Sequence, residues 1–189
     1  SLFEKYFYLQ KNFEIKTVFK TASTQDIKAI NSYKCLKNLK FIEFPKDGLE
    51  LLKKISNKIK ALNGCILMID YGYLRSNNQN TIQSVIKHRK NLVLKNLGKA
   101  DITSHVNFNL INEFFIKKKL KIKKTIPQTE FLKNMGIINR AEILSEKMSF
   151  LEKSDLYLRL KRLLNPRSMG NLFKVILAYK SKNNNYSGF

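Results

Sequence analysis

The stretch GCILMIDYGY, residues 64–73, is a run of apolar residues that ends in a carboxylate, two tyrosines and a glycine. A short continuous apolar run with polar residues after it is typical of a strand that is buried on both faces of a sheet. The residues before it, from Asp47 to Leu62, carry apolar side chains at helical spacing, and Asn63 with Gly64 is a usual helix ending. Helix, glycine and apolar strand in succession predict an α/β sheet covered on both faces.

The rest of the chain continues this alternation, with one interruption. Patterning predicts two strands within residues 3–20, joined by a turn near Lys11 and Asn12, and a short strand at Lys40–Phe44. It further predicts helices at 81–88 and 108–118, the second with Asn107 as N-cap, and a short strand at 120–125. Residues 127–164 are predicted to be helical with a break at Gly136, and residues 171–180 to form a final strand. We therefore expect residues 1–123 and 165–181 to form a partial α/β domain, residues 124–164 a helical insertion, and residues 182–189 a polar tail.

The charge balance is strongly basic. The chain has 36 basic and 14 acidic residues, a net charge of +22, which points to a nucleic-acid or acidic-surface binder. However, 30 of the basic residues are lysines, only 6 are arginines, and they are spread over almost every segment. This is the pattern that AT-rich coding sequence produces, and not the arginine-enriched surface that favours bidentate phosphate contacts. Nucleic-acid binding is therefore kept only as an alternative.

Cysteines and hydropathy bear on the compartment. Cys35 and Cys65 are the only cysteines, and we expect Cys65 to be a small buried thiol within its apolar strand. This usage favours a reducing compartment. No apolar stretch approaches the roughly 18 residues that a membrane span needs, and the N-terminus has no signal-peptide pattern. We expect a soluble intracellular chain with no membrane partner.

Several enzyme classes are excluded by missing motifs. No Gly-x-Ser-x-Gly elbow is present, the two histidines and two cysteines have no metal-ligand spacing, and no metal site is predicted. No two glycines are close enough to form a Gly-rich nucleotide turn, because they lie at positions 48, 64, 72, 98, 136, 170 and 188.

Polar residues in two loops remain as candidates for a site. Asp70, Tyr71 and Gly72 end the apolar strand, where an open α/β sheet binds its ligands. The second loop carries Asp101 and His105, with Thr103 and Ser104 between them. Plainer interpretations stay open, because a strand-end Asp can start a turn, a lone His can pack or bind a carbonyl, and an Asp two residues before a Thr can form an Asx turn.

Four motifs in order resemble the MidA family over residues 64–176. They are GCILMIDYGY (64–73), GKADITSHVNF (98–108), PQTEFLKNMG (127–136) and MGNLFKVI (169–176). The chain departs from the family pattern at several positions, with Cys65 in place of a small residue, Ile102 in place of Leu, Asn107 in place of Asp, and Met135 in place of Leu. Residues 1–40 match only as a plausible pair of strands.

The resemblance implies a fold and an activity. MidA proteins are class I S-adenosylmethionine-dependent methyltransferases with a Rossmann-like sheet, and the mitochondrial member is an arginine methyltransferase needed for assembly of respiratory complex I. By resemblance, the cofactor is S-adenosylmethionine, the substrate is a protein, and the compartment is the bacterial cytoplasm or the mitochondrial matrix.

One expected feature is missing. The family's Glu-x-Gly-x-Gly-type turn, which holds the donor, has no counterpart in the chain, so the cofactor-binding residues are unknown and are expected upstream. The chain thus resembles a carboxyl-terminal half, strands five to seven with a helical insertion. A half-sheet exposes an apolar edge, which predicts a partner, either a separate N-terminal half or a second copy. An inactive remnant that serves as an interaction module is an alternative.

The resemblance and the loops together suggest roles. Asp70 and Asp101 are predicted to grip a substrate guanidinium, and His105 completes the predicted catalytic set. The residues predicted to bind substrate are Tyr71, Gly72, Tyr73, Thr103 and Gln128.

Overall fold

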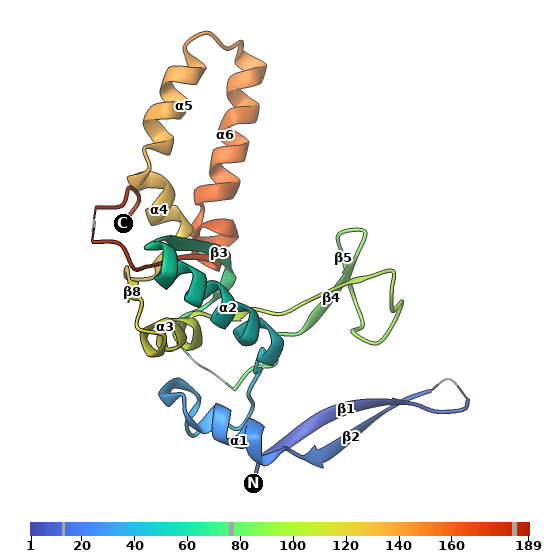
Figure 1. The fold of residues 1–189 in the computed structure, drawn as a ribbon. Coiled ribbons are helices and arrows are strands. Elements are labelled where there is room, and N and C mark those ends of the chain that lie inside the picture. Colours follow the sequence, from blue (N-terminus) through green and yellow to red (C-terminus); the bar gives the residue numbers. More distant parts are fainter. Residues whose placement is uncertain (13, 76–77, 183–184) are drawn as a thin grey trace. The chain divides into compact units, whose positions relative to one another are not determined.

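The computed structural model describes residues 1–12, 14–75, 78–182 and 185–189. The chain divides into two interleaved compact units, which are described separately below: unit 1 is Ser1–Phe44 with Asn77–His105, and unit 2 is Pro45–Ser76 with Val106–Phe189. Both contain strands and helices, as the predicted α/β class requires (Figure 1). The division into an α/β domain, a helical insertion and a tail stays a prediction.

Unit 1 begins with a β-hairpin. Strands β1 (Phe3–Leu9) and β2 (Ile15–Thr21) pair antiparallel, as the alternation of aromatic and β-branched residues predicts. Helix α1 (Thr24–Asn31) follows, and the side chain of its N-cap Ser23 accepts a hydrogen bond from the Asp26 amide at 3.0 Å.

A small antiparallel sheet completes unit 1. Strand β4 (Gln83–Ile86) lies between β5 (Arg89–Asn91) and β6 (Asp101–Thr103). The helix predicted at residues 81–88 is therefore wrong. The strand predicted at Lys40–Phe44 is also wrong, because this segment does not pair as a strand.

Unit 2 is built on a mixed sheet around β10 (Phe173–Tyr179). This strand pairs antiparallel with β3 (Cys65–Tyr73) on one side and with the short strands β8 (Lys121–Ile122) and β9 (Ile126–Pro127) on the other. Strand β7 (Val106–Asn107) pairs parallel with the last two residues of β3. The strands predicted at residues 64–73 and 171–180 are confirmed, and of the one predicted at 120–125 only Lys121–Ile122 pairs as β8.

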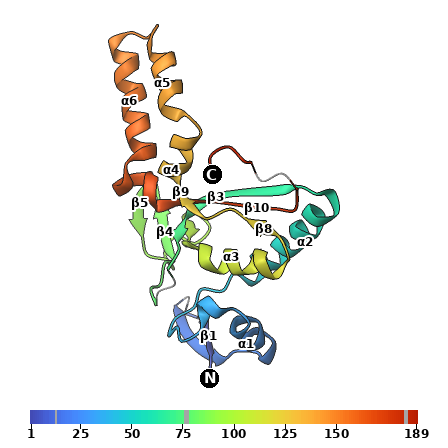
Figure 2. The same ribbon diagram turned by 90° about the vertical axis from the view of Figure 1, so that its left-hand side faces the viewer.

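Two helices cover one side of this sheet, as Figures 1 and 2 show. Helix α2 (Lys46–Leu62) ends at Asn63 in the left-handed conformation, and the Gly64 amide donates to the Ile59 carbonyl at 3.0 Å, as predicted. Helix α3 (Phe108–Lys117) supplies much of the core, with the buried side chains Phe108, Leu110, Ile111, Phe114 and Phe115.

The other side of the sheet holds three helices and the tail. Helix α4 (Gln128–Asn134) leads into the antiparallel pair α5 (Ile137–Ser145) and α6 (Phe150–Leu164), which extends away from the sheet (Figure 2). The left-handed Gly136 marks the predicted break in this helical run. At the C-terminus, Phe189 packs on Phe131, with ring centroids 5.4 Å apart, beside the buried Val175.

Strand β3 is covered less completely than its sequence predicts. Its neighbour β10 is buried from Val175 to Tyr179, yet Cys65 is exposed, and Leu67 and Ile69 are each 46% exposed. These three side chains share the face that carries Val175 and Leu177, because they stand opposite Tyr179, Leu177 and Val175 in the register. The expected two-sided burial of β3 and the expected buried Cys65 thiol are therefore wrong.

Candidate functional site

Asp70 lies near the carboxyl end of β3 and is half-buried. One oxygen of its carboxylate accepts a hydrogen bond from the Tyr71 amide at 2.8 Å. Lys174 of β10 is its direct partner in the register. The Lys174 ammonium donates to the Asn171 carbonyl, and partial burial lowers the pKa of this lysine below its ordinary value.

An aromatic pair stands beside this carboxylate. Tyr71 is opposite Phe173 in the register, and the two rings meet edge to face with centroids 5.6 Å apart. Both side chains are half-buried. Because alternate residues of a strand point to opposite faces, Tyr71 and Asp70 flank the end of β3 from its two faces.

Gly72 is buried where β3 meets β7. A Cβ atom at this position would lie 2.1 Å from the Val106 carbonyl oxygen, so only glycine allows the two strands to approach so closely. Tyr73, which is half-buried, follows and stands opposite Asn107. The structure thus gives Gly72 a packing role, and its predicted role in substrate binding stays a prediction.

Gln128 and the residue after it fasten α4 to the end of α6. The buried Gln128 amide donates to the Leu163 carbonyl at 3.0 Å, and the Thr129 hydroxyl donates to the Leu164 carbonyl at 2.8 Å. These bonds satisfy two carbonyls that have no partner within the helix. Substrate binding by Gln128 stays a prediction beside this structural role.

The second predicted group lies in unit 1. Asp101 and Thr103 are the ends of β6 and pair with Val85 and Gln83 of β4. Asp101 is exposed, Thr103 is half-buried, and the amide of the half-buried His105 donates to the Thr81 hydroxyl oxygen at 2.9 Å. The structure therefore brings Asp101, Thr103 and His105 onto one short segment, whereas Asp70–Tyr73 and Gln128 belong to unit 2.

Sequence reasoning missed the residue that holds this segment. Glu43 binds both the amide and the hydroxyl of Thr81 through its carboxylate. The signal was present in the sequence, since Glu43 interrupts an apolar stretch directly before Pro45, much as Asp70 ends its apolar strand. Sequence reasoning also missed Lys174, because its position opposite Asp70 depends on the register of the two strands.

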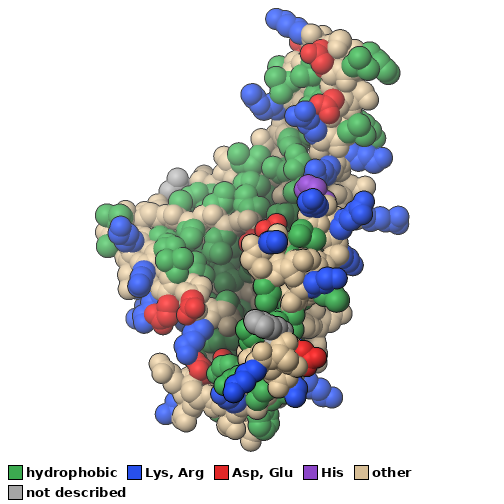
Figure 3. Space-filling model, turned by 90° about the vertical axis from the view of Figure 1, so that its right-hand side faces the viewer, with side chains coloured by type: hydrophobic (Ala, Val, Ile, Leu, Met, Phe, Trp, Pro, Cys, Tyr) green, Lys and Arg blue, Asp and Glu red, His purple; other side chains and the backbone are tan. Residues whose placement is uncertain are grey.

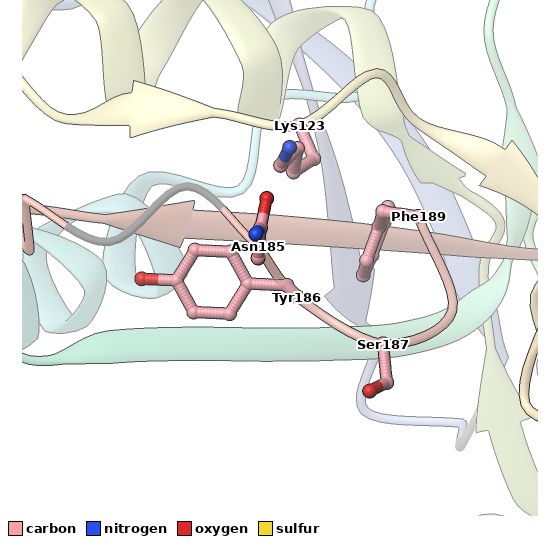
Figure 4. Close-up of a pocket in the computed structure, with 5 residues that line it drawn as sticks. All are labelled: Lys123, Asn185, Tyr186, Ser187 and Phe189. Atoms are coloured by element: carbon pink, nitrogen blue, oxygen red, sulfur yellow. The ribbon is translucent and has the colours of Figure 1, made fainter.

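One pocket of about 330 Å³ is found elsewhere in unit 2, where the tail folds back (Figure 4). None of the predicted site residues lines it; its lining residues are Lys123, Asn185, Tyr186, Ser187 and Phe189. Within the described ranges, no three His, Cys, Asp or Glu side chains are arranged to hold a metal ion. The same residues include no helix long and apolar enough to cross a membrane.

Basic side chains are dispersed over the face of the molecule that Figure 3 draws. Figure 3 shows lysine and arginine side chains scattered over the face in view, with hydrophobic side chains exposed between them. A nucleic-acid site instead gathers basic side chains in a patch or stripe.

The comparisons with known proteins define the class. Residues 2–126 match the family described as "Putative S-adenosyl-L-methionine-dependent methyltransferase". The chain belongs to this methyltransferase family, and the predicted resemblance to the MidA family is confirmed by its relatives.

These relatives are mitochondrial proteins. The chain is 32% identical over 138 residues to the protein arginine methyltransferase NDUFAF7 of Xenopus tropicalis, an alignment that covers 69% of this chain and 32% of the relative. The Homo sapiens protein of the same name is 29% identical over 133 residues, which cover 70% of this chain and 30% of that protein. The chain thus spans about a third of the length of these relatives.

Two solved structures from Burkholderia thailandensis share the fold. One is a native crystal structure of an uncharacterized protein, with a TM-score of 0.80 and 20% identity over 99% of this chain and 51% of that chain. The other is bound to S-adenosyl-homocysteine, with a TM-score of 0.79 and 20% identity over 99% of this chain and 49% of that chain. The predicted fold class is confirmed by this likeness.

The glycines of this chain bear on the expected absence of a donor-binding turn, which stays a prediction. Its seven glycines form no Gly-rich turn. Gly72 and Gly170 are explained by close packing, because a Cβ at Gly72 would strike the Val106 carbonyl and one at Gly170 the Thr129 hydroxyl. At Gly64 and Gly98 an added Cβ would meet no atom within 4 Å, and Gly98 instead adopts the left-handed conformation of a turn, with φ +78°.

Proposed function

We propose that this chain is the acceptor-binding part of an S-adenosylmethionine-dependent protein-arginine methyltransferase. The observation that carries the proposal is the alignment of 138 residues with a protein arginine methyltransferase at 32% identity, within a matching methyltransferase family. We further propose a protein substrate, such as a subunit of respiratory complex I or its homologue, and a site of action in the mitochondrial matrix or the bacterial cytoplasm.

The acceptor chemistry explains why carboxylates are needed. A guanidinium keeps its proton up to about pH 12, so its nitrogens are poor nucleophiles until one is singled out. A carboxylate that accepts two N–H bonds localises the positive charge and directs another nitrogen outward. Asp70 is suited to this role because the Tyr71 amide fixes one of its oxygens at 2.8 Å while each oxygen keeps a further lone pair.

The remaining predicted residues have supporting roles in this proposal. Tyr71, held edge to face by Phe173 on the opposite face of the strand end, is proposed to contact the substrate chain rather than the guanidinium that Asp70 holds. Asp101 supplies the second carboxylate, and His105 and Thr103 on the same segment orient the substrate chain. When bound, S-adenosylmethionine supplies the methyl group.

We propose that the methyl donor binds to a polypeptide that corresponds to the N-terminal half of the family's proteins. The outer edge of β3 supports this assignment. Over the described residues, the strand pairing on that side is with β7, through Gly72 and Tyr73, so Cys65–Asp70 have no neighbouring strand there. The exposed Leu67 and Ile69 continue it as an apolar face, the kind of surface that a further strand and its helices would cover.

Charge substitution on this face tests the assembly. A fragment of a full-length relative that carries the donor turn is mixed with the chain, and complex formation is followed by sedimentation. Leu67→Lys is expected to abolish the complex, whereas Leu62→Lys, on α2 in the same unit and 76% exposed, leaves it intact. Self-association of the chain through this face, or a complex that tolerates Leu67→Lys, would contradict the assignment.

Calorimetry and methyl transfer test the function. Titration of S-adenosylmethionine into the chain alone is expected to show no binding, and micromolar binding is expected once the donor-bearing fragment is present. The complex is then incubated with methyl-tritiated S-adenosylmethionine and a desalted protein extract, and the proteins are hydrolysed. Tritium in methylarginine is the expected product. Donor binding without any methylarginine would overturn the proposed substrate class and favour an interaction module.

A further inference from the structure

Three of the predicted site residues lie on a segment with little regular structure of its own. Strand β6 has three residues, and Ser104 and His105 follow it without secondary structure. Asp101, Ile102 and Ser104 are exposed, so burial does little to hold the segment in place. Its position must come from hydrogen bonds to neighbouring segments.

Glu43 makes two such bonds to a single residue. One carboxylate oxygen accepts from the Thr81 amide at 2.8 Å, and the other accepts from the Thr81 hydroxyl at 2.5 Å. Both bonds are partly buried, and they join two residues that are 38 positions apart in the sequence. Because the acceptor is a carboxylate, these are charge-assisted bonds, about twice as strong as neutral ones.

The same Thr81 hydroxyl also binds His105. A threonine hydroxyl has one hydrogen to donate and two lone pairs to accept. Since the hydrogen of Thr81 is donated to Glu43, its oxygen is free to accept from the His105 amide, which lies 2.9 Å away. Donation and acceptance at one oxygen polarise each other and strengthen the chain of bonds.

The connection also reaches Thr103 and Asp101. Thr81 stands two residues before Gln83, the residue of β4 that pairs with Thr103. A second tie supports the first, because the side-chain oxygen of Asn78 accepts from the Lys40 amide at 2.6 Å and from the Phe41 amide at 3.3 Å. The segments around Glu43 and Thr81 are thus bound together at both ends.

We propose that Glu43 is a positioning residue that acts through Thr81 to hold the segment bearing Asp101, Thr103 and His105 in place for the acceptor. The inference rests on the proposed function for the role of that segment. In this proposal Glu43 acts through Thr81, to which both of its carboxylate oxygens are bonded.

Nuclear magnetic resonance of the chain tests the relay without any methyl donor. Thr81→Val removes the acceptor for the His105 amide, so its hydrogen exchange is expected to accelerate about three- to tenfold. Thr81→Ser keeps the hydroxyl and is expected to restore the wild-type rate. Glu43→Gln keeps an acceptor for one Thr81 bond but not for both, so an intermediate acceleration is expected, together with shifted His105 ring signals. Glu50→Gln, on the exposed face of α2, is the matched control and should change neither.

The chain provides its own reference for local damage. It has only two histidines, and His88 lies in the turn between β4 and β5. Its ring signals and the amides of β10 should stay unchanged in all variants. An unchanged His105 exchange rate in Thr81→Val, or equal changes at His88, would overturn the inference.

A methylation assay of the assembled enzyme separates this inference from the proposed function. Thr81→Val is expected to lower methylarginine formation at least tenfold and Thr81→Ser to restore it, with donor affinity unchanged. If the wild-type complex binds the donor and makes no methylarginine, the proposed function fails, whatever the exchange data show. If the wild type is active and Thr81→Val is equally active, the positioning role fails alone.

Discussion

Lys174 stands directly opposite Asp70 in the antiparallel pairing of β10 with β3. Opposite side chains in such a pair have Cβ atoms about 4.5–5.5 Å apart and share one face of the sheet. A cation therefore neighbours the carboxylate that we propose for a cationic substrate, and Lys174 is itself held by the Asn171 carbonyl. A guanidinium that binds Asp70 must therefore either displace the Lys174 ammonium or bind the carboxylate beside it.

The lowered pKa of Lys174 predicts a pH dependence of stability. Burial places this pKa below its ordinary value of 10.5, so in the alkaline range between the two values the unfolded chain binds more protons. Stability contributed by this group therefore rises with pH through that window and is lowest below it. Lys174→Met should be more stable than wild type near pH 7, with the difference shrinking as the pH approaches 10.5.

Urea denaturation at several pH values measures this difference. Lys58→Met, an exposed lysine change on α2, is the control for the substitution itself. A gap between Lys174→Met and wild type that is constant over the whole range would contradict the argument.

Asp70→Asn is expected to weaken methyl transfer. The amide keeps one acceptor oxygen and loses the charge, and a hydrogen bond to a charged partner is worth about 1.5–3 kcal/mol, so kcat/KM should fall about 10- to 100-fold. Asp155→Asn, an exposed change on α6 that breaks only the ion pair with Arg159, should leave the rate unchanged. Arginine methylation within a few-fold of wild type in Asp70→Asn would remove Asp70 from the proposed site.

Gly72→Ala and Gly64→Ala should have opposite effects on stability. At Gly72 the new Cβ would overlap the Val106 carbonyl, a backbone atom that cannot swing away, so we expect a loss of at least about 1–3 kcal/mol. At Gly64 no atom lies within 4 Å, and alanine should be neutral or stabilise by up to about 1 kcal/mol. Urea midpoints of the two variants decide the matter, and equal midpoints would show that the β3–β7 contact is looser than described.

Local signals in the sequence were sufficient where neighbours in the chain determine the structure. The apolar spacing of α2, its Asn63–Gly64 ending and the Asn107 cap all depend on residues within one or two turns. Residues 81–88 show the limit of this reasoning. Ile82, Val85 and Ile86 have helical spacing, but Glu43 holds Thr81, and β6 pairs with β4, both from far along the chain.

The site could be predicted only as two loops. Asp70 and Asp101 follow from polar residues that end or interrupt structured segments. Lys174 and Glu43 do not, because strand register and a contact over 38 residues bring them to these loops. The prediction that β3 is buried on both faces failed for a related reason. An apolar run indicates that a face should be covered, but it does not indicate which polypeptide covers it.

Asn107 gives the last prediction, because it is both the end of β7 and the cap of α3. Its side-chain oxygen accepts from the amides of Asn109 at 3.1 Å and Leu110 at 3.2 Å, and the residue is buried. Asn107→Ala leaves those amides unsatisfied and should cost about 1–2 kcal/mol of unfolding free energy. Asn107→Asp keeps the oxygen that accepts from both amides and places a negative charge at the positive end of the helix, so it should lose less than half as much. Urea denaturation of the two variants measures this, and an aspartate variant as unstable as the alanine variant would mean that the side-chain amide, rather than its oxygen, holds this corner of unit 2.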